Sequence, residues 1–203
     1  NPVDSGALSR LAQKKITLPK FGDPTLPLFV SVGRLAKQKG MERLINWVAA
    51  LNIKANLIII GTGEQRENLL SIIQHGRLER QGQLIGFQDN PFPYMAAANA
   101  VLLGSYWEGL PNVGLEALAL GKTVIATGEC GGLIDMKLRH SIGDLIIAKT
   151  ADQFIFEMEQ ISKNHVPSKA YPAYKFKIVK SSLPPEFDVK TVVNHYKTII
   201  FGT

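Results

Sequence analysis

The 203-residue sequence has only one cysteine, Cys130, so no disulfide can form within the chain. A chain without disulfides is typical of a reducing compartment, and we expect a cytoplasmic protein. No apolar run approaches the roughly 18 residues that span a bilayer, and the first residues lack the pattern of a signal peptide. A catalytic thiol would need a histidine and an electropositive setting, and we do not expect Cys130 to be one.

Motifs for metal binding are also scarce. No Asp-x-Asp pair occurs, and the four histidines do not have the spacing of metal ligands. We therefore assign no role to His75, His140, His165 and His195.

The remaining composition is that of a globular domain. Hydrophobic residues make up 45% of the chain and charged residues 20%, which argues against disorder. The net charge is +6, which favours anionic partners without choosing among them.

Short apolar runs alternate with segments of helical spacing. The predicted strands are 28–32, 57–60, 83–85, 100–103, 123–126 and 145–147. The predicted helices cover 41–51, the surroundings of 69–73, 94–98, 113–120 and the surroundings of 154–161. This order indicates an α/β fold, a Rossmann-like doubly wound parallel sheet with helices on both faces. Ligands of such sheets bind beyond the carboxyl ends of the strands, here the loops that open at Gly33, Gly61, Phe87, Gly104 and Thr127.

Four parts of one domain follow from these patterns. Residues 1–27 are expected to be a linker, 28–162 the Rossmann-like core, 163–187 a basic loop and 188–201 an amphipathic C-terminal helix. Tyr171, Tyr174 and Phe176 lie among lysines in the third part. Such a mixture also suits a nucleic-acid or membrane patch, but we favour a surface connection and expect no nucleic-acid partner.

The segment 105–117 carries the strongest chemical pattern. Pro111 and Asn112 suit the start of a helix, whose N–H groups and dipole favour a phosphate or sugar oxygen. Glu108 and Glu116 flank that start, with seven residues between them. Two carboxylates could bind two parts of one ligand, and one carboxylate suits a pair of vicinal hydroxyls. Spacing alone does not exclude the alternative, in which Glu116 only complements the helix dipole and Glu108 is a surface acid.

The stretch from Glu108 to Glu116 resembles the E-x7-E motif of family 4 glycosyltransferases, and residues 117–126 continue that family's usual sequence. The similarity covers roughly residues 1–160. Further matches in the same order are Val32-Gly33-Arg34-Leu35 with Lys39-Gly40, Ile60-Gly61-Thr62-Gly63, Ile85-Gly86-Phe87 and Cys130-Gly131-Gly132.

The resemblance implies one half of a GT-B enzyme, namely the carboxyl-terminal domain that binds the nucleotide sugar. Gly33, Arg34 and Lys39 would bind the nucleotide sugar, with Arg34 and Lys39 neutralising the diphosphate. Glu116 would hold the ribose hydroxyls and Glu108 would contact the donor sugar. Backbone groups near Leu110, Asn112 and Val113 would contact the sugar and the phosphates. Glu108, Arg34 and Lys39 are thus the candidate catalytic residues. The implied reaction transfers a hexose-type sugar with retention of configuration, from a UDP-sugar by family habit, with no cofactor and no metal.

The same resemblance suggests surface polysaccharide or lipopolysaccharide synthesis, with a glycan or lipid-linked acceptor. The acceptor would bind an amino-terminal domain that we expect to be absent from this chain, so the isolated domain should be inactive. Peripheral association with the inner face of the cell membrane would fit this family. Two departures stand out: Glu-Gly-Leu-Pro-Asn begins at Glu108 where Glu-Gly-Phe-Gly is common, and Asp135 lies where a glutamate often occurs.

Two rival functions remain open at this point. The first is a dinucleotide-dependent oxidoreductase. Gly61-Thr62-Gly63 has two glycines of the dinucleotide-binding fingerprint, but Arg66 occupies the place of the third. A non-catalytic module that binds nucleotides or phosphosugars and regulates a partner would keep Arg34, Lys39 and Glu116 without turnover.

Overall fold

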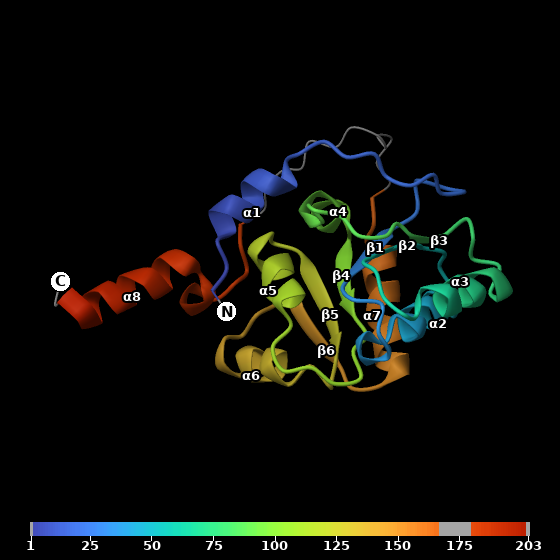
Figure 1. The fold of residues 1–203 in the computed structure, drawn as a ribbon. Coiled ribbons are helices and arrows are strands. Elements are labelled where there is room, and N and C mark those ends of the chain that lie inside the picture. The colour runs from blue at the N-terminus through green and yellow to red at the C-terminus, as the bar shows by residue number, and fades with distance from the viewer. Residues whose placement is uncertain (1, 167–179, 202–203) are drawn as a thin grey trace.

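A six-stranded, fully parallel sheet forms the centre of the molecule (Figure 1). The structure is a computed structural model, and it describes residues 2–166 and 180–201. The strands are β1 (Leu28–Val32), β2 (Asn56–Ile60), β3 (Gly82–Leu84), β4 (Ala100–Leu103), β5 (Thr123–Thr127) and β6 (Leu145–Ala148). Their order across the sheet is β3-β2-β1-β4-β5-β6, which is the Rossmann order. The predicted fold class is confirmed.

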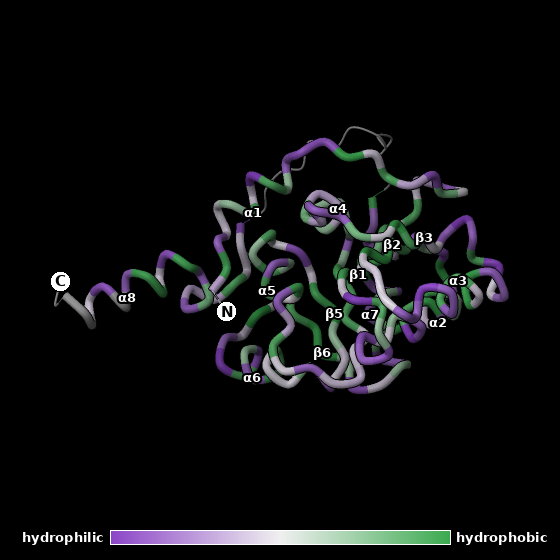
Figure 2. The backbone as a smooth tube through the Cα atoms, viewed as in Figure 1, coloured by the Kyte–Doolittle hydropathy of each residue, from purple (hydrophilic) through white to green (hydrophobic). Residues whose placement is uncertain are grey.

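Helices cover both faces of the sheet because the strands are apolar on both sides (Figure 2). In β1, Leu28 and Val30 contribute to one buried cluster and Phe29 to the other. One face carries α2 (Met41–Ala49), α3 (Arg66–His75) and α7 (Ala151–Lys163). The opposite face carries α1 (Ser5–Ala12), α4 (Phe92–Ala97), α5 (Asn112–Ala119) and α6 (Gly131–Arg139).

The segment 1–27, expected to be a linker, contains a helix that packs on the core. Asp4 caps α1, because its carboxylate accepts a hydrogen bond from the Ala7 N–H at 2.8 Å. Leu8 and Ala12 are buried in the apolar cluster where α1 packs against α4 and α5. The prolines of this segment lie outside the helix and Gly6 lies within its first turn, so residues 5–12 form a packed helix where a linker was predicted.

Other boundaries differ by smaller amounts. β3 begins one residue earlier than predicted, and α6 follows Cys130 directly although it opens with two glycines. Of the predicted basic loop, Lys163 ends α7 and Pro185–Phe187 form a short 3-10 helix, η2. Tyr171, Tyr174 and Phe176 lie outside the described residues.

The start of the described chain pairs with the segment that immediately precedes the last helix. Val3 forms a parallel β-bridge with Asp188, and the Ser5 hydroxyl donates to the Asp188 carboxylate at 2.8 Å. The predicted terminal helix is α8 (Val189–Phe201), which starts at this bridge and extends away from the sheet (Figure 1). Among the described residues, no helix is both long enough and apolar enough to cross a membrane.

Candidate functional site

A polar cavity of about 230 Å³ opens where the strand order reverses, between the carboxyl ends of β1 and β4. Ser31 and Val32 line it from β1, and the segment from Leu103 to Ser105 lines it from β4. Its remaining walls come from Lys39, Met41, Glu108 and residues 110–113. We call it the switch-point cavity. Ligands of open α/β sheets bind at this place because two connections leave the sheet in opposite directions there.

Lys39 and Glu108 form an ion pair in this cavity although they are 69 positions apart. Lys39 lies in the 3-10 helix η1 (Lys37–Lys39) after β1, and Glu108 lies in the loop after β4. Only 24% of the Lys39 side chain and 14% of the Glu108 side chain are exposed. The Ser105 hydroxyl donates to the second carboxylate oxygen of Glu108 at 2.7 Å. Both oxygens of Glu108 are thus held in defined positions.

Glycines allow these loops to approach one another closely. Gly40 has φ +57°, and a Cβ there would lie 2.0 Å from the carbonyl oxygen of Gly104. Gly61 has φ +143°, and a Cβ there would lie 1.8 Å from the carbonyl oxygen of Gly33. The loops after β1, β2 and β4 therefore pack backbone against backbone, which only glycine permits.

The amino-terminal end of α5 forms one wall of the cavity. Pro111 is the N-cap, with φ −69° and without a side-chain cap, and Asn112 is the first helical residue. Pro111, Asn112 and Val113 all line the cavity. The first N–H groups of a helix have no intrahelical acceptor and carry the positive end of the dipole, so this wall favours an anionic ligand.

Arg34 and Glu116 lie outside the cavity walls. The Arg34 side chain is exposed in the loop after β1, and Glu116 is half-buried one turn inside α5. Burial raises the pKa of the Glu116 carboxyl above its ordinary value. Gly33 lies against Lys39, since a Cβ at Gly33 would be 3.7 Å from the Lys39 side chain. Of the predicted residues, the structure thus groups Lys39, Glu108 and the segment 110–113 with Gly33 beside them.

Two supporting residues carried no signal in the sequence. Arg43 donates to the carbonyl oxygens of Gly104 and Ser105 at 3.2 Å each. The Thr127 hydroxyl, at the end of β5, donates to the Ser105 carbonyl at 2.7 Å. Both residues thus hold the Ser105 carbonyl oxygen. They belong to α2 and β5, which no local sequence pattern connects with Ser105.

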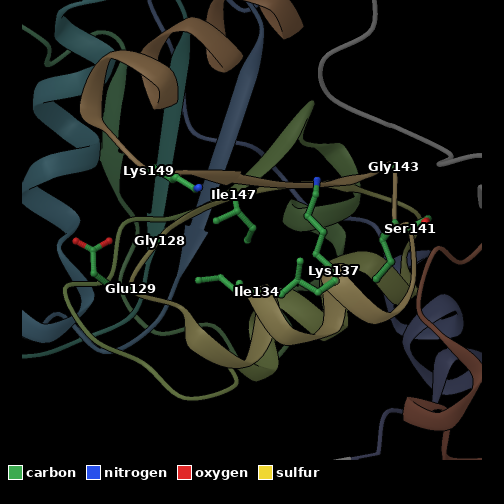
Figure 3. Close-up of a pocket in the computed structure, with 10 residues that line it drawn as sticks. Gly128, Glu129, Ile134, Lys137, Ser141, Gly143, Ile147 and Lys149 are labelled. Carbon is green, nitrogen blue, oxygen red and sulfur yellow. The ribbon is translucent and has the colours of Figure 1, made fainter.

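A larger hollow lies along the edge strand β6 (Figure 3). This α6–β6 cleft has a volume of about 1030 Å³ and mostly apolar walls, with Ile134 of α6 facing Ile147 of β6. Lys137 donates to the Leu145 carbonyl oxygen, so its ammonium group is already paired. The complete lining is Gly128, Glu129, Ile134, Lys137, Leu138, Ser141, Ile142, Gly143, Ile147 and Lys149.

Within the described part of the chain, no cluster of three His, Cys, Asp or Glu side chains could hold a metal ion. Cys130 is fully buried, and burial raises the pKa of its thiol to about 11. Its thiolate is thus disfavoured at neutral pH.

Comparisons with known proteins show the family to which the chain belongs. Residues 14–176 match the family described as glycosyl transferases group 1. The chain is 30% identical over 172 residues to N-acetylgalactosamine-N,N'-diacetylbacillosaminyl-diphospho-undecaprenol 4-alpha-N-acetylgalactosaminyltransferase of Campylobacter jejuni, covering 84% of this chain and 45% of that protein. It is also 30% identical to the putative teichuronic acid biosynthesis glycosyltransferase TuaC of Bacillus subtilis, covering 85% and 42%.

Solved structures with less than 25% identity share the fold. HepE of Anabaena in complex with UDP superposes with a TM-score of 0.74 at 19% identity, covering all of this chain and 56% of that one. The lipopolysaccharide outer core galactosyltransferase WaaB gives 0.71 at 24% identity, covering all of this chain and 54% of that one. The chain thus spans about half the length of the proteins it matches. Because the family match covers most of its residues, the chain belongs to the glycosyl transferases group 1.

Proposed function

We propose that this chain binds the nucleoside-diphosphate sugar for a retaining GT-B glycosyltransferase of surface polysaccharide or lipopolysaccharide synthesis. The observation that carries the proposal is the switch-point cavity, where Lys39, Glu108 and the start of α5 converge. The proposed donor is a UDP-hexose, bound without a metal ion.

The diphosphate would lie between Lys39 and the amino-terminal end of α5. Lys39 offers an ammonium group at the cavity wall, and the helix offers N–H groups beside Asn112 and Val113. A departing nucleoside diphosphate gains negative charge, and fixed positive groups in a recessed site stabilise that charge. Arg34 is exposed at the same edge of the sheet and would reach the phosphates from outside the cavity.

Glu108 would have two successive roles. Without a ligand its carboxylate pairs with Lys39 and accepts from Ser105. When the diphosphate takes over part of the Lys39 charge, the carboxylate would remain held by Ser105 and free to accept a hydroxyl of the donor sugar. Glu116, one turn further along α5, would accept the ribose hydroxyls.

The relatives support the proposed donor and pathway class. HepE was crystallised with UDP and also with UDP-glucose. The relative from Campylobacter jejuni acts on a diphospho-undecaprenol glycan, and TuaC is associated with teichuronic acid. For this chain, these substrates and the acceptor remain part of the proposal, because it spans about half of each relative.

Calorimetric titration tests the proposal directly. The purified chain is titrated with UDP, GDP and NAD in buffer containing EDTA, and we expect one nucleoside diphosphate to bind and NAD not to bind. Glu116→Ala should weaken that binding about 10-fold to 100-fold, as for a lost hydrogen bond to a charged group. Glu67→Ala, on the exposed side of α3, is the matched control and should bind as the parent does.

Each other outcome argues against the proposal. Binding of NAD alone would favour an oxidoreductase, and binding that requires a divalent metal would contradict the metal-free site. If no nucleotide binds, this chain does not hold a preformed donor site. The chain can also be joined to the acceptor-binding half of a relative, a half that is active when it carries its own donor-binding half. If this fusion binds the donor but transfers no sugar, a non-catalytic binding module is favoured.

A further inference from the structure

Two exposed aromatic side chains directly precede Glu108. Trp107 is 58% exposed and Tyr106 is 36% exposed, and their ring centroids lie 6.5 Å apart. Neither residue lines the switch-point cavity, although Glu108, the next residue, does. Adjacent Cα atoms are about 3.8 Å apart, so this aromatic pair, Tyr106 and Trp107, lies at the rim of the cavity.

The backbone of the aromatic pair is fixed. The Gln38 side chain donates to the carbonyl oxygen of Trp107 at 2.9 Å, and the Tyr106 N–H donates to the carbonyl oxygen of Gln38 at 2.8 Å. The Arg43 guanidinium lies 4.2 Å from the centre of the Tyr106 ring. The exposed indole is thus carried by a loop that is braced from η1 and α2.

This combination suits a binding surface. Single exposed apolar residues are common, but two adjacent aromatic rings on a braced loop lose little conformational entropy when they bind a partner. An aromatic face is negative and an aromatic edge positive. The axial C–H groups of a pyranose ring give it a weakly positive, apolar face that complements an indole.

We propose that Trp107, with Tyr106 beside it, is a stacking platform for one pyranose ring of the acceptor glycan, whose other contacts would come from the amino-terminal half of the enzyme. The inference rests on the proposed function, because it places this ring at the rim of the cavity where the donor sugar would lie. The ring would enter from the η1 side, and its hydroxyls would face the polar groups of the rim. The platform would thereby orient the acceptor without taking part in bond making.

The two tryptophans of the chain allow a direct test. Trp47 lies on α2 with its ring 4.5 Å from the Phe154 ring and serves as an internal reference. The chain is labelled with 5-fluorotryptophan, and Trp107→Phe assigns the two fluorine resonances. Methyl α-glucopyranoside, methyl α-galactopyranoside and methyl N-acetyl-α-glucosaminide are then titrated with and without UDP, with sorbitol as an acyclic control.

We expect at least one pyranoside to shift the Trp107 resonance in a saturable way, while the Trp47 resonance and the sorbitol titration stay unchanged. Trp107→Ala should weaken pyranoside binding about threefold to tenfold in calorimetry, and Trp107→Phe should weaken it less. UDP affinity should be the same in both variants.

Other results overturn the inference. If no pyranoside moves the Trp107 resonance while UDP binds, the platform is wrong and the proposed donor site stands. If the resonance instead depends on protein concentration, the aromatic pair is a surface for self-association. If UDP also fails to bind, the proposed function itself is contradicted.

Discussion

The two hollows of the molecule differ in size and in construction. The α6–β6 cleft is several times larger than the switch-point cavity, about 1030 Å³ against 230 Å³. Yet its walls are mostly apolar, and its lysine Lys137 is paired with a backbone carbonyl. The smaller cavity combines an ion pair, a helix amino terminus and the carboxyl ends of two strands.

We infer from this difference that converging polar groups, rather than volume, distinguish the candidate site. A nucleoside diphosphate carries most of its binding energy in charged oxygens, which need fixed donors. The cleft lies along an edge strand, away from the reversal of strand order. We therefore expect changes in the cavity to alter stability or nucleotide binding and equivalent changes in the cleft to alter neither.

The largest effect should come from a glycine pair that contrasts the two hollows. Gly40→Ala places a Cβ 2.0 Å from the Gly104 carbonyl at positive φ and should lower the free energy of unfolding by roughly 3 kcal/mol. Gly143→Ala in the cleft meets no atom within 4 Å and should change it by less than about 0.5 kcal/mol. Urea denaturation measures both. Equal losses would mean that the cavity loops are not packed as described.

The next effect concerns one lysine from each hollow. Lys39→Met should weaken UDP binding about 10-fold to 100-fold, since a charge-assisted contact with the diphosphate is lost. Lys149→Met, in the cleft lining, should leave the affinity within about twofold. Calorimetry gives both dissociation constants. A stronger effect at Lys149 would move the nucleotide site to the cleft.

A smaller effect should appear in the pH dependence of stability. Because burial raises the pKa of Glu116, the folded state binds this proton more tightly than the unfolded state. Its contribution to stability is therefore lost as the pH rises from below the ordinary carboxyl pKa towards neutrality. Glu116→Gln should match the parent near pH 4 and exceed it near pH 7 by about 1 kcal/mol or less. A variant less stable than the parent at pH 7 would show that the carboxylate has a stabilising partner.

The smallest effect is expected at Cys130, in the loop between the two hollows. Its thiol is buried and its pKa is raised to about 11, so iodoacetamide at pH 8 should not label the folded chain. The same reagent should label it fully in urea, which mass spectrometry can follow. Rapid labelling of the folded chain would show that this loop opens.

The sequence was sufficient to predict the sheet because most of its strands are short apolar runs bounded by a glycine or a polar turn. The predicted ranges 28–32 and 100–103 coincide with β1 and β4. It was insufficient for α1, whose flanking prolines suggested a linker, and for α6, whose first two residues are glycines. Helix formation there depends on packing against the core, which local propensity does not contain.

The residues of the candidate site were predictable from the sequence, but the contacts between them were less so. The family-like motifs named Lys39, Glu108 and the segment 110–113, and the structure brings these together. The direct pairing of Lys39 with Glu108, and the hydrogen bond from Ser105, depend on the crossover that places β4 beside β1. Such long-range contacts follow from topology, and no residue pattern encodes them.

The central claim is that the switch-point cavity, and not the larger cleft, binds the nucleotide. A ¹⁵N-labelled sample of this 22.3 kDa chain can be titrated with UDP and followed residue by residue by NMR. The account predicts that the amide resonances of Gly33, Lys39, Asn112 and Val113 shift in a saturable way while those of Ile134 and Ile147 do not. Saturable shifts confined to α6 and β6 would contradict it.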